Sequence, residues 1–209
     1  LDATIIQNDT AICFGDSVII AAGLSNANTL LSPLSACSLP ASLSVGLSGA
    51  WPFCNNAIDE TGNGNNGSVF GATLTAGQSG TPNTAYYFDG INDYISLSAP
   101  FFQGGNNVQE FTYASIFKAE DLPSSGQGYH ISGKEGFWRS ISLSVGSDGQ
   151  ISFGGSQPNP NSYFGVTSPD NTIVPGQWHT VIVRFNNSFL ELFVDNVLVG
   201  SSSLNFFFG

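Results

Sequence analysis

The residues of this chain best suited to chemistry lie between Asp59 and Gly67, where a carboxylate precedes a run of glycines and asparagines. Glycine adopts positive φ angles that turn backbone carbonyls toward one point, and asparagine tolerates the same angles while adding a side-chain oxygen. Calcium prefers such oxygen ligands and binds about six to eight of them. The chemistry of the loop therefore fits a calcium site with Asp59 as its anionic ligand, and from the loop alone a tight turn capped by Asp59 is the stronger alternative.

A second acidic segment follows at Asp89-Gly90-Ile91-Asn92-Asp93. Aspartate and glycine at this spacing are typical of a hairpin turn. The two carboxylates also offer oxygen ligands beside the first loop. We favour the turn.

Catalytic constellations are hard to assemble from these residues. A glycoside hydrolase needs two carboxylates across a cleft, and Glu191 and Asp195 share one strand face with Asp195 at a turn. A serine hydrolase needs a histidine beside a serine and an acid, yet the two histidines, His130 and His179, lie in a predicted loop and a predicted strand. We expect both histidines to be structural and the chain not to be an enzyme.

Three aromatic residues in polar segments are candidates for contacting a sugar, namely Tyr129, Trp138 and Tyr163. An aromatic face packs against the C–H groups of a sugar ring, while asparagine, aspartate and backbone groups bind its hydroxyls. Most other aromatics fall at alternating strand positions and belong to the core.

Composition limits the possible partners. The 209 residues include 15 acidic and only four basic ones, for a formal net charge of −11. Nucleic acid and anionic membranes both require lysine and arginine, so neither is an expected partner. No run of 18 or more apolar residues is present, which argues against membrane insertion. Charged residues make up only 9%, so serine, threonine, asparagine and glycine must form much of the surface, as suits a β-rich extracellular protein.

The chain has three cysteines, Cys13, Cys37 and Cys54, without a C-x-x-C pair. A zinc site or a redox dithiol is therefore not expected. In an exported protein two of the three can pair, and we favour a bridge between Cys37 and Cys54, which flank one short segment. Three buried free thiols are the alternative.

Alternating hydrophobicity predicts antiparallel strands joined by Asn, Asp and Gly turns. The expected strands are 111–117, 141–145, 151–153, 178–185, 189–194 and 197–199, together with the large side chains of Trp51-Pro52-Phe53. No window shows sustained helical periodicity. Apolar residues on one face of each strand imply two stacked sheets that share one core, which is an all-β antiparallel sandwich.

Three parts are expected along the chain. Residues 1–24 contain two short apolar runs around a Phe14-Gly15-Asp16 turn, and residues 25–45 are a linker without clear period. Residues 46–209 form the main domain. Because the chain ends within the apolar run Asn205–Gly209 and does not begin with methionine, we expect it to be a piece of a longer protein that lacks its last strand.

Two segments resemble one known family. WPF, followed by DETGNGNNG and then AYYFDGINDYI, looks like the N-terminal half of laminin-G-like, concanavalin A-like jelly-roll domains of secreted bacterial proteins, notably those of Bacteroidetes. The W-H-T-V and L-E-L-F-V-D-N segments resemble the later strand pair of the family. Separately, ICFGDSV near the N-terminus resembles a strand of immunoglobulin-like modules, so residues 1–24 would be a remnant of one.

The resemblance implies a two-sheet jelly-roll sandwich with a structural calcium near its rim, and it adds Gly62, Asn63 and Asn65 to Asp59 as metal ligands. It also implies a noncatalytic, calcium-dependent module that binds a glycan or an extracellular protein surface beside neighbouring domains of a longer chain. A glycoside hydrolase or polysaccharide lyase of the same fold is the alternative. The final strand, which often adds an acidic ligand in the family, is expected to be missing here.

Overall fold

The computed structural model describes residues 47–97, 110–134, 141–156, 163–186 and 188–203. These residues form strands and turns and contain no helix, as the absence of helical periodicity predicts. The strands, in chain order, are β1 (Gly67–Phe70), β2 (Thr73–Thr75), β3 (Ala85–Tyr87), β4 (Tyr94–Leu97), β5 (Glu110–Lys118), β6 (Gly128–Lys134), β7 (Ile141–Gly146), β8 (Ile151–Ser156), β9 (Tyr163–Thr167), β10 (Trp178–Asn186), β11 (Phe189–Val194) and β12 (Val197–Ser203).

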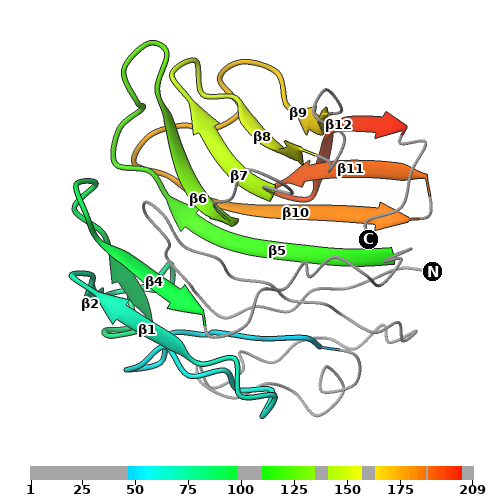
Figure 1. Ribbon diagram of the computed structural model, residues 1–209. Helices are drawn as coiled ribbons and strands as arrows, with labels where there is room; N and C mark the ends of the chain where they lie inside the picture. Colours follow the sequence, from blue (N-terminus) through cyan, green and yellow to red (C-terminus); the bar gives the residue numbers. More distant parts are fainter. Residues whose placement is uncertain (1–46, 98–109, 135–140, 157–162, 187, 204–209) are drawn as a thin grey trace.

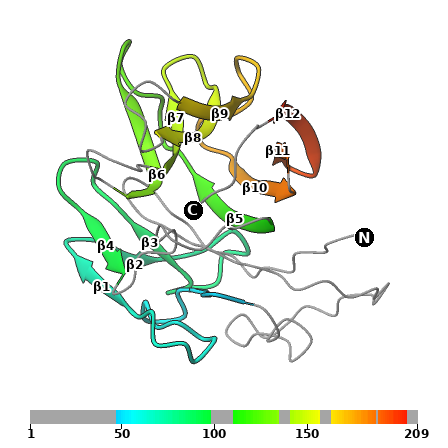
Figure 2. The same cartoon turned by 45° about the vertical axis from the view of Figure 1, so that its right-hand side comes forward.

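Two four-stranded antiparallel sheets dominate the described part of the chain. One has the order β12-β11-β10-β5 and the other the order β6-β7-β8-β9. Two small ladders, β1-β4 and β2-β3, complete the structure. In Figures 1 and 2 the β6–β9 sheet lies on one side of β5, and β1, β2 and β4 lie on the other. The all-β antiparallel sandwich is therefore confirmed, with the N-terminal strands in small ladders of their own.

The six strands expected from alternation after residue 110 are all present. β7 and β10 alternate strictly between buried and half-buried residues, so each presents one face to the core. β5 differs, because every residue from Tyr113 to Phe117 is buried. Small side chains at Ala114 and Ser115 let this strand be covered on both faces.

One hydrophobic core joins the two large sheets. Phe111 and Tyr113 of β5 lie 6.0 and 6.3 Å from Phe153 of β8, measured between ring centroids. Phe111 also lies 5.7 Å from Phe185 of β10. Offset and tilted aromatic pairs at these separations add to the free energy gained by burying their area. The rings therefore link the sheets face to face, as expected for a sandwich.

The Trp51-Pro52-Phe53 segment was expected to be a strand, and this was wrong. The segment belongs to none of the described strands, and Phe53 has a positive φ of 53°, which interrupts an extended chain. Its place in the core was predicted correctly, because Trp51 and Phe53 are both 1% exposed. Phe53 packs edge-on against Tyr86 of β3, with the ring centroids 5.1 Å apart.

The parts expected at both ends of the chain lie outside the described residues. This applies to the strand pair and linker of residues 1–45 and to the final apolar run. In the part that the structure does describe, no helix has the length and apolar character needed to cross a membrane.

The close approach of β8 and β9 yields a stability test. A Cβ atom at Gly154 would lie 2.5 Å from the backbone oxygen of Phe164 and 2.9 Å from the Cα of Gly165. Gly154→Ala should therefore lower the free energy of unfolding by about 1–3 kcal/mol, because the backbone of β9 must move. Gly128→Ala on β6 is the control, since its Cβ would meet only Val145 O at 3.7 Å, and it should change stability by less than about 1 kcal/mol. Equal urea midpoints for the two variants would contradict this account.

Candidate functional site

Asp59 occupies the centre of the glycine- and asparagine-rich loop and is only 3% exposed. Its Oδ1 accepts hydrogen bonds from Ala50 N at 3.1 Å, Thr61 N at 3.1 Å and Thr61 Oγ1 at 2.7 Å. Its Oδ2 accepts one from Asn65 N at 3.1 Å. A buried carboxylate needs such donors to offset its desolvation. Asp59 therefore ties the loop to the chain that precedes Trp51.

The two predicted asparagine ligands turn their side-chain nitrogens back onto that preceding chain. Asn63 Nδ2 donates to Leu47 O at 2.9 Å, and Asn65 Nδ2 donates to Ser48 O at 2.8 Å. The carbonyl of Asn65 accepts a hydrogen bond from Trp51 Nε1 at 2.9 Å. The loop thus closes over the buried Trp51, and much of its polarity is used in holding itself together.

Calcium would find a limited set of oxygens in this arrangement. Oδ1 of Asp59 is saturated by three donors, and Oδ2 alone has capacity for a cation. Among the described residues, no group of three or more His, Cys, Asp or Glu side chains is placed to hold a metal. The other ligands would have to be loop carbonyls, the Asn63 side-chain oxygen and water. Calcium at Asp59, with Gly62, Asn63 and Asn65, stays a prediction.

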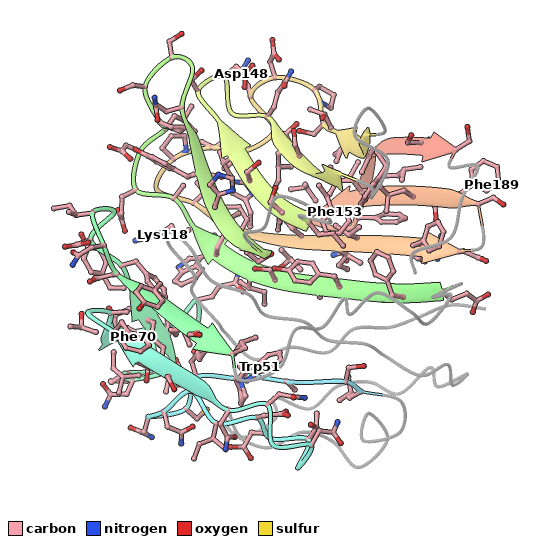
Figure 3. All side chains as sticks on the ribbon, in the orientation of Figure 1. Trp51, Phe70, Lys118, Asp148, Phe153 and Phe189 are labelled. Carbon is pink, nitrogen blue, oxygen red and sulfur yellow. The ribbon has the colours of Figure 1, made fainter. Side chains whose placement is uncertain are left out.

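A pocket of about 230 Å³ lies elsewhere, where the β3–β4 turn meets the ends of β5 and β6. In Figure 3 the labelled Lys118 marks the end of β5 on this side of the molecule, and Phe189 marks the far side. The lining comes from four segments of the chain and comprises Tyr87, Phe88, Asp89, Gly90, Phe117, Ala119, Glu120, Asp121, Tyr129, Ile131 and Val145.

The pocket has an apolar floor and a polar rim. Phe88, Phe117, Ile131 and Val145 are buried and belong to the core. Three carboxylates, from Asp89, Glu120 and Asp121, line the same space, and Tyr87 is 46% exposed beside them. A floor that binds apolar surface and a rim that accepts hydrogen bonds is the composition of a small-ligand site.

Tyr129 is the predicted ligand residue that the structure places in this pocket. It lies on β6 and not in a loop as expected, and its hydroxyl donates to Asp121 Oδ1 at 3.0 Å. Desolvation, followed by the hydrogen bond to Asp121 and the charge of that carboxylate, raises the pKa of the Tyr129 hydroxyl. The hydrogen bond to Asp121 fixes the ring at the pocket wall.

The other two aromatic candidates are not tested by the described residues. Trp138 lies outside the described residues, and only the backbone of Tyr163 is described, at the start of β9. Sequence reasoning also missed the rim carboxylates Glu120 and Asp121. The signal available was the Lys118-Ala119-Glu120-Asp121 run at the end of a strand, which in so weakly charged a chain is unusual.

The Asp89–Asp93 segment forms the predicted turn. Asp93 Oδ2 accepts from Asp89 N at 3.0 Å, and Asp89 Oδ1 accepts from Ile91 N at 2.8 Å. Gly90 supplies a positive φ of 74°. The turn also places Asp89 at the rim of the pocket. Asp89 therefore belongs to the candidate site at this pocket and not to the predicted calcium loop.

His179 and Asp195 are structural partners across neighbouring strands. His179 is 4% exposed, more deeply buried than the half-buried position expected from sequence. Its Nδ1 lies 2.8 Å from Asp195 Oδ2, and its Nε2 accepts from Val174 N at 3.0 Å. With both nitrogens engaged and little solvent access, this pair anchors a turn. His130 is exposed on β6, where a loop was expected.

Cys54 is buried next to the Trp51–Phe53 segment. Cys13 and Cys37 both lie outside the described residues. The pairing of Cys37 with Cys54 therefore stays a prediction.

Comparison with known proteins agrees with the fold. The family described as the concanavalin A-like lectin/glucanases superfamily matches residues 88–207, more than half of the chain. One similar solved structure is a 2.1 Å crystal structure of residues 221–444 of an S-layer domain-containing protein from Clostridium thermocellum ATCC 27405. It is 21% identical, with 75% of this chain and 72% of that chain covered and a TM-score of 0.33. No curated protein sequence matches the chain.

The hydrogen bonds of Asp59 predict a large stability effect. Asp59→Asn puts an amide NH₂ where the carboxylate faces only donors, so it should lower the free energy of unfolding by about 2–4 kcal/mol. Glu60→Gln, which removes one charge from the exposed neighbouring residue, should change it by less than about 0.5 kcal/mol. Urea unfolding in the presence of chelator measures both. An unchanged midpoint for Asp59→Asn would show that the Asp59 carboxylate does not stabilise the loop.

Proposed function

Since the chain belongs to the concanavalin A-like lectin/glucanases superfamily, we propose that it is a noncatalytic carbohydrate- or surface-binding module of a secreted multidomain protein. The superfamily includes binding proteins and enzymes, so the residues of the site, and not the fold, must decide between the two functions. The observation that carries it is the pocket beside Tyr129, in which aromatic rings and carboxylates surround an apolar floor.

The chemistry of the pocket suits one sugar ring. The buried floor of Phe88, Phe117 and Ile131 accepts apolar C–H surface, and the rings of Tyr87 and Tyr129 offer faces for the same contact. The carboxylates of the rim are acceptors for sugar hydroxyls. Its volume is below that of typical pockets for drug-sized ligands, so the site fits a single residue of a glycan and not a long segment.

The cysteines bear on secretion through the predicted bridge between Cys37 and Cys54. Such a bridge would be typical of an oxidising compartment, such as the outside of the cell. A surface of uncharged polar residues fits the same location, because only 9% of the chain is charged.

A glycoside hydrolase or polysaccharide lyase is the second candidate, because Asp89, Glu120 and Asp121 share one pocket. Hydrolysis needs a carboxyl group free to donate a proton and another to act as base or nucleophile. Each of these groups is already engaged in a contact within the protein. Asp121 accepts from Tyr129, Glu120 pairs with Lys118 at 2.7 Å, and Asp89 caps its turn.

Binding should depend on the ring of Tyr129. In a titration with a glycan selected from an array, Tyr129→Ala should weaken binding about tenfold or more, because an aromatic contact is lost at the pocket wall. Tyr129→Phe keeps the ring and should lose only about twofold to threefold. Phe189→Ala is the control, as an exposed aromatic outside the pocket lining, and should leave affinity unchanged. An equal loss in the Phe189 variant, or no glycan bound at all, would contradict the proposal.

Turnover separates the module from the enzyme. We expect no soluble product from β-glucans or alginates at high protein concentration. Product that forms with the unaltered chain and disappears in Asp121→Asn would establish the catalytic alternative, since that substitution keeps the partner of Tyr129 but removes the acid.

We further propose that calcium adds to a loop that hydrogen bonds already hold. A site of roughly 10 µM affinity in 1 mM calcium would stabilise the fold by about 2.7 kcal/mol. Calcium should therefore raise the melting temperature by about 5–10 °C over chelator, and the chelated chain should still be folded. Asp59→Asn should abolish the increment. The same melting temperature with calcium and with chelator would rule out this metal site.

A further inference from the structure

The charged residues that line the pocket are acidic, and this narrows the class of sugar that the pocket would bind. We propose that it selects a saccharide bearing a protonated amine over neutral and anionic saccharides. This inference rests on the proposed binding function, because it names the ligand class of the same site. It follows from which side chains line the pocket and from how each is already engaged.

Among the residues that the structure describes, the charged members of the lining are Asp89, Glu120 and Asp121, with no lysine, arginine or histidine. Lys118 pairs with Glu120, with Nζ 2.7 Å from its Oε1. Asp89 and Asp121 therefore carry the negative charge that a cationic ligand would meet. A chain of formal net charge −11 adds to the negative potential at this rim. An anionic sugar would meet repulsion here, and a cationic one attraction.

The hydrogen bonds around the rim leave acceptor capacity for a ligand. The described contacts use Oδ1 of Asp121 for Tyr129 and Oδ1 of Asp89 for the turn. The Oδ2 atoms of both carboxylates take no part in these bonds. An ammonium group offers three N–H donors, so it can bind two carboxylate oxygens and still bind water.

A metal ion is a poorer match than an organic cation. The pocket carboxylates do not form a group of three or more side chains that could hold a metal, within the residues that the structure describes. They stand around an apolar floor that includes Phe117 and Ile131, which a hydrated metal ion would leave unused. A ring carrying an amine uses both parts, because its C–H surface covers the floor and its charge faces the rim.

The two tyrosines add to the same preference. Tyr87 is 46% exposed, and Tyr129 is held at the wall by its bond to Asp121. The face of a tyrosine ring attracts a cation that comes within about 6 Å of it. The hydroxyl of Tyr129 donates to Asp121, and desolvation together with this carboxylate raises its pKa.

A matched set of oligosaccharides tests the inference. Binding is measured by calorimetry at mildly acidic pH for a glucosamine oligomer, the N-acetylglucosamine oligomer of the same length, and a galacturonate oligomer. The first two differ in charge through acetylation of the amine. We expect the glucosamine oligomer to bind about tenfold tighter than the acetylated one, the galacturonate oligomer not to bind, and affinity to fall as salt is raised.

Variants locate the effect in the pocket. Asp121→Asn keeps an acceptor for Tyr129 while removing a charge, so it should weaken the glucosamine oligomer about threefold to tenfold and leave the acetylated oligomer nearly unchanged. Asp170→Asn removes one charge at an exposed position outside the lining and should have no effect on either. Equal losses in the two variants would show a general charge effect and overturn the inference.

The outcomes separate this inference from the function beneath it. Tight binding of neutral or anionic oligomers at the Tyr129 site would overturn the ligand class and leave the binding function standing. Failure of every saccharide on an array, with the chain shown to be folded, would overturn both. A lysine derivative that binds more tightly than any amino sugar would assign the pocket to a basic side chain of a protein partner. That outcome would also overturn the inference that the ligand is a saccharide.

Discussion

Strand β5 is buried without a break from Tyr113 to Phe117, so apolar groups must cover both of its faces. One side of the strand carries Tyr113, whose ring meets Phe153 of the opposing sheet. β5 also pairs along its whole length with β10, from Trp178↔Lys118 to Asn186↔Glu110. Its position is thus fixed by packing and by ladder hydrogen bonds. The residues that follow β5 directly are held in place by their attachment to it.

The pocket is a direct consequence. Phe117, the last fully buried side chain of β5, forms part of its floor, and Glu120 and Asp121 follow at once where the chain leaves the core. The β3–β4 turn and β6 supply the remaining walls. A pocket at the end of a rigid strand keeps its geometry without a ligand. The free-energy cost of ordering its side chains on binding is therefore small.

Buried polar side chains in this chain link separate segments through hydrogen bonds. Asp59 joins its loop to Ala50, and His179 joins β10 to the Asp195 turn and to Val174. Both would be costly if unpaired, because desolvating an unsatisfied polar or charged group disfavours folding. The carboxylates around Tyr129 are exposed, so each makes a contact within the protein without being desolvated. This contrast is why the pocket, and not either histidine, is the better place for a ligand.

The sequence by itself determined the six strands that alternate clearly, β5, β7, β8, β10, β11 and β12, since alternation and turn residues are local signals that need no partner to be recognised. It did not identify the short strands β1 to β4, nor β6 and β9. It also placed Trp51 and Phe53 in the core and identified Asp59 and Tyr129, but it misjudged the Trp51–Phe53 conformation because a positive φ at a phenylalanine has no sequence signature. Only the tertiary structure decided the site. Tyr87 lies far along the chain from Asp121 and Tyr129, and it meets them because β3 comes to lie beside the ends of β5 and β6. That arrangement depends on sheet packing, which no local pattern encodes.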